Sequence, residues 1–422
     1  MTARGPRLPV EEAVARILRT AEDCAVAWES VPVREAAGRV LQETIEARHT
    51  HPAWRNSAMD GYAVHADDVR GATAESPVTL PVAGTIAAGD RAPGAVPRGT
   101  AWRIMTGAPV PDGIDSVVRV EDTDAGALQV TIRSDRDAGA NIRPRGEDFM
   151  QGQPLLSAGD TLRAPHVAIA AAAGRSAVRV ARRPRIAILT SGNELVDVDR
   201  FDEVLAGQRI IDTNGYALAA AIEEAGGEPV DLGIARDDPA AIAERITGAP
   251  PFDALVTCGG ISVGAFDYTR DVVQRLGATL DFWRVRMRPG GPFGFGLLGG
   301  RPWFGLPGNP VSALVTFEVF VRPALRIMGR HGVTERSAVA VRLASPVTTA
   351  GGLTHFLRAV VDEDGVAHLT GPQGSGMLTS MVAATALLIV PHDVSYLPAG
   401  ATVRALLLVP GFFPQRAVPW TY

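Results

Sequence analysis

Lysine is absent from the 422-residue chain, and cysteine occurs only twice. The 41 basic residues are therefore all arginines, which excludes any reaction that needs a lysine amine. Cys24 and Cys258 form neither a CxxC pair nor a zinc-spaced set, and this indicates a reducing compartment without a structural metal. None of the eight histidines has a partner at metal-ligand spacing, so no histidine metal site is predicted. We expect a cytoplasmic protein.

Long apolar runs and an excess of basic charge are also missing. The longest apolar run, Val167–Ala173, is too short to span a bilayer, and no apolar signal segment follows the first residues. A formal net charge of -5 gives no general attraction toward nucleic acid, so an anionic ligand requires a local cluster of cations. We therefore expect neither a membrane nor a nucleic acid as partner.

Several enzyme signatures do not occur. The chain has no GxSxG elbow, Walker loop or Rossmann fingerprint, so the usual assignments to hydrolases, P-loop NTPases and dehydrogenases lack support. With 46% hydrophobic and 21% charged residues, the composition is that of a chain that folds throughout. Because domains usually run to roughly 100–200 residues, we expect three or four of them.

The first 180 residues predict a helical part interrupted by a β-rich part. Apolar residues occur at helical spacing at Val14, Ile17, Leu18 and Ala21. A second apolar run is Val40–Ile45, and an Ala-rich helix is expected over Ala164–Gly174. Short β-type runs broken by Gly, Pro and Asp are Val78–Val82, Ala101–Met105 and Leu128–Ile132. The later helix is expected to pack back on the opening helices. This gives an elongated helical domain (1–50 and 145–180) with an inserted β-rich domain (51–144).

Strands and helices alternate in the middle of the chain. The expected strands are Ile186–Thr190, Pro229–Ile234 and Ala254–Cys258. A helix over Gly215–Ala225 lies between the first two, and Asp238 is placed to cap another that starts at Pro239. This alternation predicts a central αβα domain (181–330) with a mostly parallel sheet. Three later β-type runs, Ala338–Leu343, Phe356–Val361 and Ala386–Val390, predict a C-terminal β-barrel or small sandwich (331–422).

Ligands bind beyond the carboxyl ends of strands in a parallel sheet, so the loops after the strands are the candidate site. Four such loops are Ser191–Glu194, Arg236–Asp238, Gly259–Gly264 with Asp267 after it, and Pro307–Ser312 at the start of a helix. Glycines and helix N-termini suit phosphate. Each loop alone is better explained as a plain turn. Together with Glu194, Asp237 and Asp267, however, they indicate a phosphate site with a hard cation such as magnesium.

Other segments have the composition of binding loops. Phe282–Arg288 places three arginines on one side of an expected strand, where they would either cradle oxyanions or form a solvated face. Asn56–Ala63, Arg103–Pro109 and Asn141–Asp148 mix small and polar residues without helical or strand period. These three segments of the β-rich part are binding loops or plain turns.

Taken together, the motifs resemble those of the MoeA family, which includes the E domain of gephyrin. The matching segments are NSAMDGYAV from Asn56, RIMTGAPVP from Arg103, NIRPRGEDF from Asn141, SGNEL from Ser191, IIDTNGYAL from Ile210, LGIARDDP from Leu232, GGISVGAFDYT from Gly259, GLPGNPVSA from Gly305 and GPQGSGMLTSM from Gly371. They occur in the family's order and cover nearly the whole chain.

The resemblance implies a multidomain α/β fold with the four domains above and a homodimer. The active cleft would lie between the αβα domain of one subunit and the inserted domain of the other. The implied reaction is the final step of molybdenum cofactor biosynthesis: adenylylated molybdopterin and molybdate are substrates, Mg²⁺ is required, and AMP is released. Implied protein partners are the molybdopterin adenylyltransferase and molybdoenzyme apoproteins.

Site residues follow from the resemblance by matching position. The implied catalytic residues are Asp60, Thr106 and Asp148 from the inserted domain and Glu194, Asp237 and Asp267 from the αβα domain, the last three also as metal ligands. The implied cofactor-binding residues are Ser191, Gly192, Gly259, Gly260, Ser262, Gly264, Arg284, Arg288, Pro307, Gly308, Asn309, Pro310 and Ser312.

The chain departs from the family pattern at four positions. Arg284, Arg288 and Gly291 stand where the family usually has lysines, and Asn193 replaces an acid. Gly291 and Asn193 motivate a second hypothesis, a dimer of the same fold that holds molybdopterin or a partner protein without catalysis. A third is another nucleotide-processing enzyme like the molybdopterin adenylyltransferases. The inserted-domain motifs argue against it, because those enzymes lack them.

Overall fold

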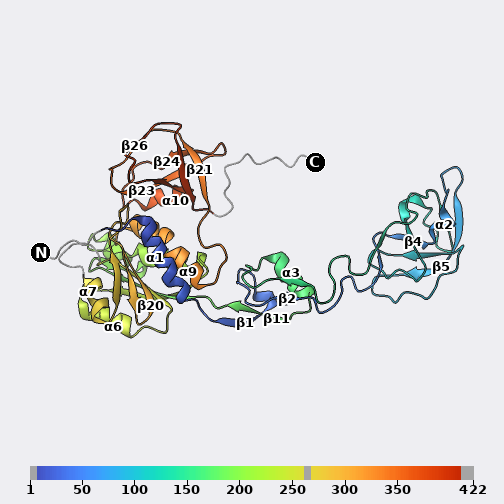
Figure 1. Cartoon of the computed structure of the whole chain (residues 1–422), viewed down its shortest axis with the longest axis horizontal. Coiled ribbons are helices and arrows are strands. Elements are labelled where there is room, and N and C mark those ends of the chain that lie inside the picture. Colours follow the sequence, from blue (N-terminus) through green and yellow to red (C-terminus); the bar gives the residue numbers. More distant parts are fainter. Residues whose placement is uncertain (1–6, 261–267, 410–422) are drawn as a thin grey trace.

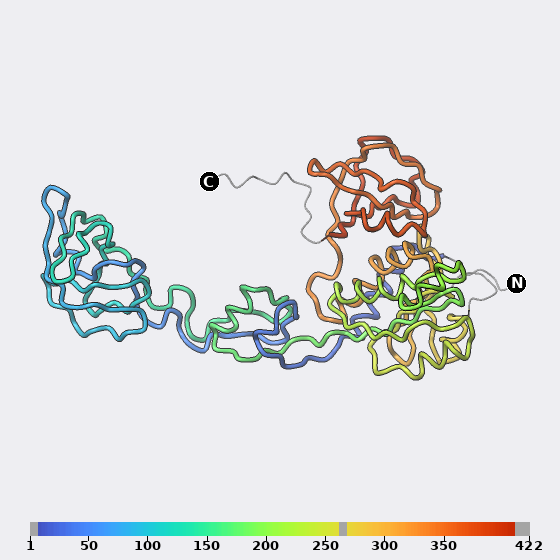
Figure 2. Tube along the Cα trace, turned by 180° about the vertical axis from the view of Figure 1, so that it is seen from behind, coloured from blue at the N-terminus to red at the C-terminus, as the bar shows by residue number. Residues whose placement is uncertain are grey.

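The molecule is elongated and has four parts. The computed structural model describes residues 7–260 and 268–409. An αβα body with the C-terminal barrel beside it forms one end, a narrow middle segment follows, and a β-rich domain forms the other end (Figure 1; Figure 2 shows the same trace from behind).

A six-stranded sheet in the order β15-β12-β16-β20-β19-β17 organises the body. Its strands are β12 (Arg185–Ser191), β15 (Glu228–Ala235), β16 (Ala254–Cys258), β17 (Thr279–Trp283), β19 (Gly294–Leu298) and β20 (Arg301–Leu306). The first four in spatial order are parallel, whereas β19 runs antiparallel to both of its neighbours. The predicted mostly parallel sheet is confirmed, and its carboxyl ends are gathered at one edge.

Helices cover both faces of this sheet. They are α1 (Val10–Asp23), α5 (Thr213–Glu224), α6 (Pro239–Thr247), α7 (Tyr268–Arg275), α8 (Pro310–Thr316), a π-helical turn (Phe317–Val321) and α9 (Arg322–Met328). Alternate residues of β12 point to opposite faces: Ile186 belongs to the core under α1, α5, α8 and α9, and Ala187 to the core under α6 and α7. As predicted, the Asp238 carboxylate caps α6 by accepting from the Ala241 N–H at 2.8 Å.

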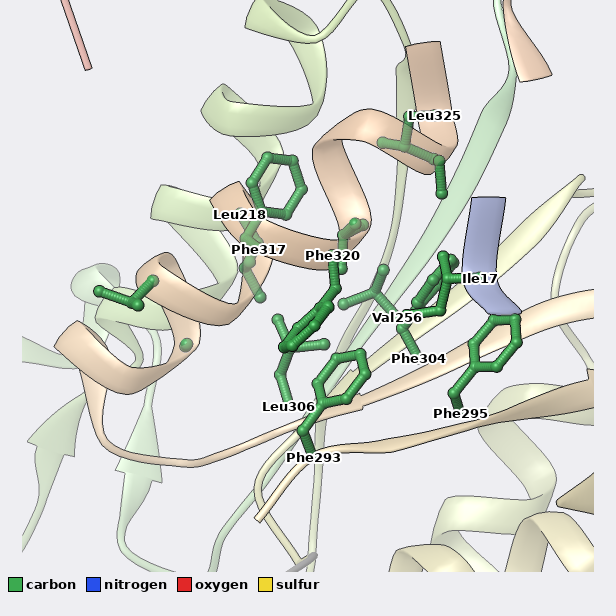
Figure 3. Close-up of a cluster of buried hydrophobic side chains, with 14 of the residues drawn as sticks. Ile17, Leu218, Val256, Phe293, Phe295, Phe304, Leu306, Phe317, Phe320 and Leu325 are labelled. Carbon is green, nitrogen blue, oxygen red and sulfur yellow. The ribbon is translucent and has the colours of Figure 1, made fainter. Parts of the chain in front are cut away.

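Aromatic side chains fill the larger of the two cores. Phe293, Phe295, Phe304, Phe317 and Phe320 lie between the sheet and the helices (Figure 3). Phe293 and Phe320 stack with ring centroids 4.4 Å apart. This packing fixes the start of α8 relative to the end of β20.

The opening helix lies in the body, which corrects its predicted place in an elongated helical domain. In α1, Val10, Ala13, Ile17 and Ala21 are buried in the main core, and α1 lies beside α9 (Figure 1). The helical period was predicted correctly. The period shows which face of a helix is apolar, but it does not show which surface covers that face.

The middle segment is mainly a two-stranded ribbon with one helix. It contains β1 (Trp28–Pro32), the 3₁₀ turn Val33–Glu35, β2 (Ile45–Glu46), β10 (Pro154–Leu156), α3 (Ala164–Ala172) and β11 (Ala177–Ala181). Strands β1 and β11 pair antiparallel, as do β2 and β10. The prediction of an elongated helical domain is therefore wrong. Helix α3 shares a small core with Leu41, Leu156 and Val178 of this segment and does not pack on α1.

The inserted domain is β-rich, as predicted. Its elements are β3 (Asn56–Ser57), β4 (Gly61–Val64), α2 (Ala66–Val69), β5 (Val78–Ile86), β6 (Ala101–Ile104), β7 (Ser116–Arg119), the 3₁₀ turn Val120–Asp122, β8 (Gln129–Ile132) and β9 (Ile142–Arg143). Five of the strands form a sheet in the order β7-β4-β6-β5-β8. The chain enters through β3 and leaves through β9, and these two strands pair with each other.

The C-terminal part is a closed five-stranded barrel, which decides between the two predicted alternatives. Its elements are β21 (Ala338–Leu343), β22 (Val347–Thr348), β23 (Thr354–Val361), β24 (Val366–Leu369), α10 (Leu378–Ala383), β25 (Ala386–Val390), β26 (Tyr396–Leu397) and β27 (Thr402–Leu407). The ring runs β23-β24-β21-β27-β25 and closes through the β23–β25 pairing. The short strand β18 (Met287–Arg288) of the body pairs with β23 and ties the two parts together.

The remaining elements of the body form a small flap: β13 (Leu195–Val196), the 3₁₀ turn Val198–Arg200, α4 (Phe201–Leu205) and β14 (Ile210–Ile211). Strands β13 and β14 pair in parallel. None of the described helices has the length and apolar character needed to cross a membrane.

The position of α1 predicts the effect of a substitution in its buried face. Because Ile17 is fully buried in the main core, Ile17→Ala is expected to lower the free energy of unfolding by roughly 2–5 kcal/mol. Urea unfolding followed by circular dichroism measures this. The matched control is Arg19→Ala on the exposed face of the same helix, expected to leave the midpoint in place. Equal midpoints for the two variants would contradict the packing of α1 on the body.

Candidate active site

A cavity of about 500 Å³ lies where the carboxyl ends of β12, β16 and β20 meet. Its predicted lining residues are Ser191, Gly192, Glu194, Asp237, Gly259, Gly260, Pro307, Gly308, Asn309, Pro310 and Ser312. Ser262, Gly264 and Asp267, which were predicted for the same site, lie outside the described residues. The structure thus brings residues from all four predicted loops into one cavity, which we call the sheet-edge pocket, whereas Arg284 and Arg288 lie outside it.

Glycine is required where the loops of this pocket touch. At Gly259, with φ +95°, an added Cβ would lie 2.5 Å from the backbone oxygen of Ser191. At Gly260, with φ +61°, it would lie 2.4 Å from the Thr269 hydroxyl oxygen. The loops after β12 and β16 can therefore approach this closely only because these residues lack side chains, and the Gly259 N–H is itself donated to the Leu306 backbone oxygen at 3.1 Å. The buried Ser191 hydroxyl has no hydrogen-bond partner within the described parts of the chain, so it is available to a ligand.

The floor of the pocket depends on two residues that were not predicted as site residues. The buried Asp212 carboxylate accepts from the Thr190 hydroxyl at 2.6 Å and from the Gly215 N–H at 3.1 Å, which caps α5. The Asn214 side-chain amide donates to the Gly308 backbone oxygen at 2.7 Å. Both residues belong to the IIDTNGYAL segment, whose Asp followed by a helical pattern is a recognisable N-cap signal.

Cys258 forms part of the pocket wall. Its thiol donates to the Pro307 backbone oxygen at 3.2 Å. Burial, with a smaller contribution from the nearby Asp212 charge, raises the pKa of this thiol well above its usual range. The thiol therefore stays protonated and joins the loops after β16 and β20; it is not a nucleophile.

The carboxylates of the pocket suit magnesium in number and type. Glu194 and Asp237 both line it. Asn193 and Asp237 exchange hydrogen bonds: the Asn193 N–H donates to the Asp237 carboxylate at 3.1 Å, and the Asp237 N–H donates to the Asn193 side-chain oxygen at 3.2 Å. Within 7–260 and 268–409, no three or more His, Cys, Asp or Glu side chains form a metal-binding group. Two carboxylates are nevertheless what Mg²⁺ uses when substrate phosphates and waters complete its coordination.

An adjoining cavity of about 590 Å³ is lined by arginines, and we call it the arginine pocket. Arg7, Arg284 and Arg288 line it together with Gly291 and residues of the barrel loop Gln373–Ser375. Pro292, Asn309 and Ser312 line both pockets, so the two cavities are contiguous.

The predicted arginine strand is corrected by the structure. Strand β17 ends at Trp283, Arg284 has φ +94°, and the chain resumes strand pairing only in β18. The Val285 N–H donates to the Gly291 backbone oxygen, and Leu8 forms an isolated bridge to Val285, so the pairing changes partner here. Arg284 and Arg288 reach the arginine pocket, whereas Arg286 is not among its lining residues.

The three motifs of the inserted domain converge on one another. Pairing of β3 with β9 places Asn56 opposite Arg143, and the Gly107 N–H donates to the Ser57 backbone oxygen at 2.8 Å. The Asp60 carboxylate accepts from both the N–H and the hydroxyl of Thr106, each at 2.7 Å. These bonds, the backbone one foremost, lower the pKa of Asp60 below its usual range.

The predicted site residues fall into two groups that one chain does not bring together. Asp60 precedes β4 at the far end of the molecule, away from the body that holds both pockets (Figure 1). Asp148 lies on the connection from the inserted domain to the middle segment, where its N–H donates to the His51 backbone oxygen at 3.2 Å. One copy of the chain therefore does not assemble the whole of the predicted site.

Known protein families and relatives match nearly the whole chain. Models of the MoeA N-terminal region (domains I and II), of a probable molybdopterin-binding domain and of the MoeA C-terminal region (domain IV) match residues 8–174, 187–327 and 340–408. Molybdopterin molybdenumtransferase 2 of Mycobacterium tuberculosis is 39% identical over 385 residues, 89% of this chain and 94% of that protein. The molybdopterin molybdenumtransferase of Nostoc sp. is 36% identical over 389 residues, 90% of this chain and 88% of that protein.

Solved structures agree over the length of the fold. A structure of the molybdopterin biosynthesis MoeA protein of Pyrococcus horikoshii OT3 superposes with a TM-score of 0.79 at 29% identity, covering 95% of this chain and all 100% of that one. A second Pyrococcus structure of the same description gives a TM-score of 0.77 at 32% identity and covers 95% of this chain and 99% of its own.

The hydrogen bonds to Asp60 predict how its pKa responds to substitution. Thr106→Val removes the hydroxyl and keeps the backbone N–H, so the pKa of Asp60 is expected to rise toward its ordinary value without reaching it. Carbon-detected NMR of labelled aspartates over a pH series measures the shift. The control is Thr100→Val, whose hydroxyl donates only to the Pro97 backbone oxygen. An unchanged Asp60 titration in Thr106→Val would show that this hydroxyl does not stabilise the carboxylate.

Proposed function

The chain belongs to the MoeA family, and from this premise we propose that it is a molybdopterin molybdenumtransferase that inserts molybdenum in the last step of molybdenum cofactor synthesis. Its substrates would be adenylylated molybdopterin and molybdate, and AMP would be released. One observation carries the proposal: a glycine-rich pocket with two carboxylates adjoins an arginine-lined pocket, and the two share Pro292, Asn309 and Ser312. This pair of cavities offers one place for a phosphate-rich ligand and another for an oxyanion.

The sheet-edge pocket would hold the pterin phosphates. Gly259 and Gly260 leave room beside Ser191 because they lack side chains, and the Ser191 hydroxyl is buried without a partner among the described residues. Glu194 and Asp237, with Asp267 from the adjoining loop, would hold Mg²⁺ there. When bound, this ion would neutralise charge that develops on the phosphoanhydride as it is cleaved. The reciprocal bonds between Asn193 and Asp237 keep the Asp237 side chain in place for this role.

The arginine pocket would hold molybdate beside the pterin. Arg284 and Arg288 carry permanent positive charge, and their planar forks donate paired hydrogen bonds to oxyanions. Ser312 lines both pockets and would contact a ligand at the point where the two meet.

Asp60, Thr106 and Asp148 of a second copy would close the site in a homodimer. Because the pKa of Asp60 is depressed, this group stays an ionised acceptor at neutral pH and below. It would then orient a water or a metal-bound group toward the phosphoanhydride of the neighbouring subunit.

The non-catalytic hypothesis rests on Gly291 and Asn193. Asn193 accepts the Asp237 N–H through an oxygen that an aspartate would also supply, so this departure keeps the loop intact. Gly291 is the stronger observation, because it lines the arginine pocket without contributing a charge. A dimer that binds molybdopterin without inserting molybdenum is therefore the second candidate. The adenylyltransferase hypothesis has no such support, since the inserted-domain motifs form one assembled surface.

One assay separates the two candidates. Purified protein is mixed with adenylylated molybdopterin, Mg²⁺ and molybdate, and AMP release is followed together with activation of a molybdenum-free apoenzyme. The transferase is expected to give both signals, and both should vanish without molybdate or Mg²⁺. Ligand binding without either signal would establish the non-catalytic candidate and overturn the proposed function.

Mixing two inactive variants tests whether the site is shared between copies. Asp60→Asn and Glu194→Gln are each expected to abolish turnover, because each removes a carboxylate from one half of the site. In co-expressed heterodimers one site carries both substitutions and the other carries neither. About one quarter of wild-type turnover should therefore return after random pairing. No recovery in verified heterodimers would place both residues in the site of a single chain, or outside the site.

A further inference from the structure

The arginine pocket contains more positive charge than its neighbourhood neutralises. Arg7, Arg284 and Arg288 line it, and none of its lining residues is an aspartate or glutamate. Among the described residues, none of the three arginines takes part in an ion pair. Three cations that converge without a carboxylate repel one another, and a bound anion relieves that repulsion.

Arg7 was not predicted as a site residue, and the backbone around it explains its place. The Leu8 N–H donates to the Arg284 backbone oxygen at 3.2 Å, and the Arg286 N–H donates to the Leu8 backbone oxygen at 2.8 Å. These two bonds flank the parallel bridge between Leu8 and Val285. Helix α1 starts two residues later and is buried in the main core. Residue 7 is therefore held against the segment that carries the other two arginines.

The same contact supports the unusual backbone of Arg284. A non-glycine residue at φ +94° is strained, and such strain persists where surrounding contacts determine the conformation. The Arg284 N–H donates to the Phe293 backbone oxygen at 2.9 Å, while its own backbone oxygen accepts from Leu8. The segment around Leu8 thus both presents Arg7 and holds Arg284 in its place.

We propose that Arg7 is an anion-binding residue that supplies the third positive charge of the arginine pocket and sets its affinity for a tetrahedral oxyanion. The proposal rests on the proposed function for the identity of that oxyanion, which is free molybdate or a phosphate group of the pterin substrate. Gly291 lines the same cavity and contributes no side chain, so the third cation of the pocket comes from the segment before α1. The guanidinium of Arg7 adds a planar donor fork to those of Arg284 and Arg288.

Direct binding tests this role without turnover. Equilibrium dialysis of the full chain against molybdate alone, and separately against inorganic phosphate, gives the affinity for each oxyanion. Arg7→Gln is expected to weaken molybdate binding about tenfold, the effect of losing one charge-assisted contact. Arg288→Gln serves as the reference for a pocket arginine. Arg19→Gln, an exposed arginine of α1, is the matched control and should bind as the wild type does.

A rescue variant separates charge from local structure. In this fold an added Cβ at Gly291 would lie 3.1 Å from the Met287 backbone oxygen, a contact that a few tenths of an ångström of adjustment relieves. Arg7→Gln combined with Gly291→Lys is therefore expected to recover most of the lost affinity, because a cation returns to the same cavity. Weak binding by this double variant would mean that Arg7 acts through the backbone near Leu8 and not through its charge, which would overturn the proposal.

The outcomes distinguish this proposal from the proposed function. Unchanged affinity for both molybdate and phosphate in Arg7→Gln, or binding of neither oxyanion by the wild type, overturns the role of Arg7 even if AMP release and molybdenum insertion are observed. If Arg7→Gln loses oxyanion affinity but the wild type shows no turnover, the role of Arg7 is upheld and the proposed transferase function is overturned. A tenfold loss for phosphate with none for molybdate assigns the pocket to the pterin phosphate, while equal losses show that Arg7 acts on any tetrahedral oxyanion.

Discussion

The close approach of three loops at the carboxyl edge of the parallel sheet is the constraint on which the rest of the site depends. A Cβ built on Gly259 would lie 2.5 Å from the Ser191 backbone oxygen, and one built on Gly308 would be in van der Waals contact with the Gly259 Cα at 3.6 Å. Buried polar bonds hold the loops at this distance, from Asn214 to the Gly308 oxygen and from Cys258 to the Pro307 oxygen. The loop amides are used in the same way, since the Gly259 N–H donates to the Leu306 oxygen and the Gly192 N–H to the Ala235 oxygen, whereas the buried Ser191 hydroxyl has no partner among the described residues and remains for a ligand.

The barrel completes the arginine pocket as well as covering the body. The Val311 N–H at the start of α8 donates to the Ser375 backbone oxygen at 3.0 Å, and β18 pairs with β23. Inside the barrel, the fully buried Arg358 donates to the backbone oxygens of Pro372 and Gly374 at 3.2 and 3.1 Å. This arginine therefore fixes the loop that lines the pocket. A change deep in the barrel would therefore alter the arginine pocket without touching its lining directly.

Local sequence patterns predicted the helices and strands well, but they did not predict which elements pack or pair with one another. The bounds of β16, β21 and β25 could be read from the sequence because each is a short apolar run bounded by turns. Helix α1 was recognised by its period, yet its packing on α9 depends on residues more than 300 positions away. In the sequence, Arg284, Arg286 and Arg288 alternate with Val285 and Met287, which hides the change in hydrogen-bond partner; in the structure the alternation shifts at Arg284, because Phe282 and Val285 are both buried. The motifs grouped Asp60 with Thr106, but only the fold shows that the two side chains are bonded.

The distance between the two halves of the site follows from how the arm is built. From the body outward, β1 pairs with β11, β2 with β10 and β3 with β9, so the outgoing and returning segments are bonded to each other at three places along the arm. An arm with paired backbones resists bending more than a single linker does, because each pairing must break before the arm can fold back. The inserted domain therefore cannot easily return to the pockets of its own chain. The exposed Asp60 and Thr106 are held at a fixed reach and orientation, which suits them to meet the equivalent pockets of a second copy.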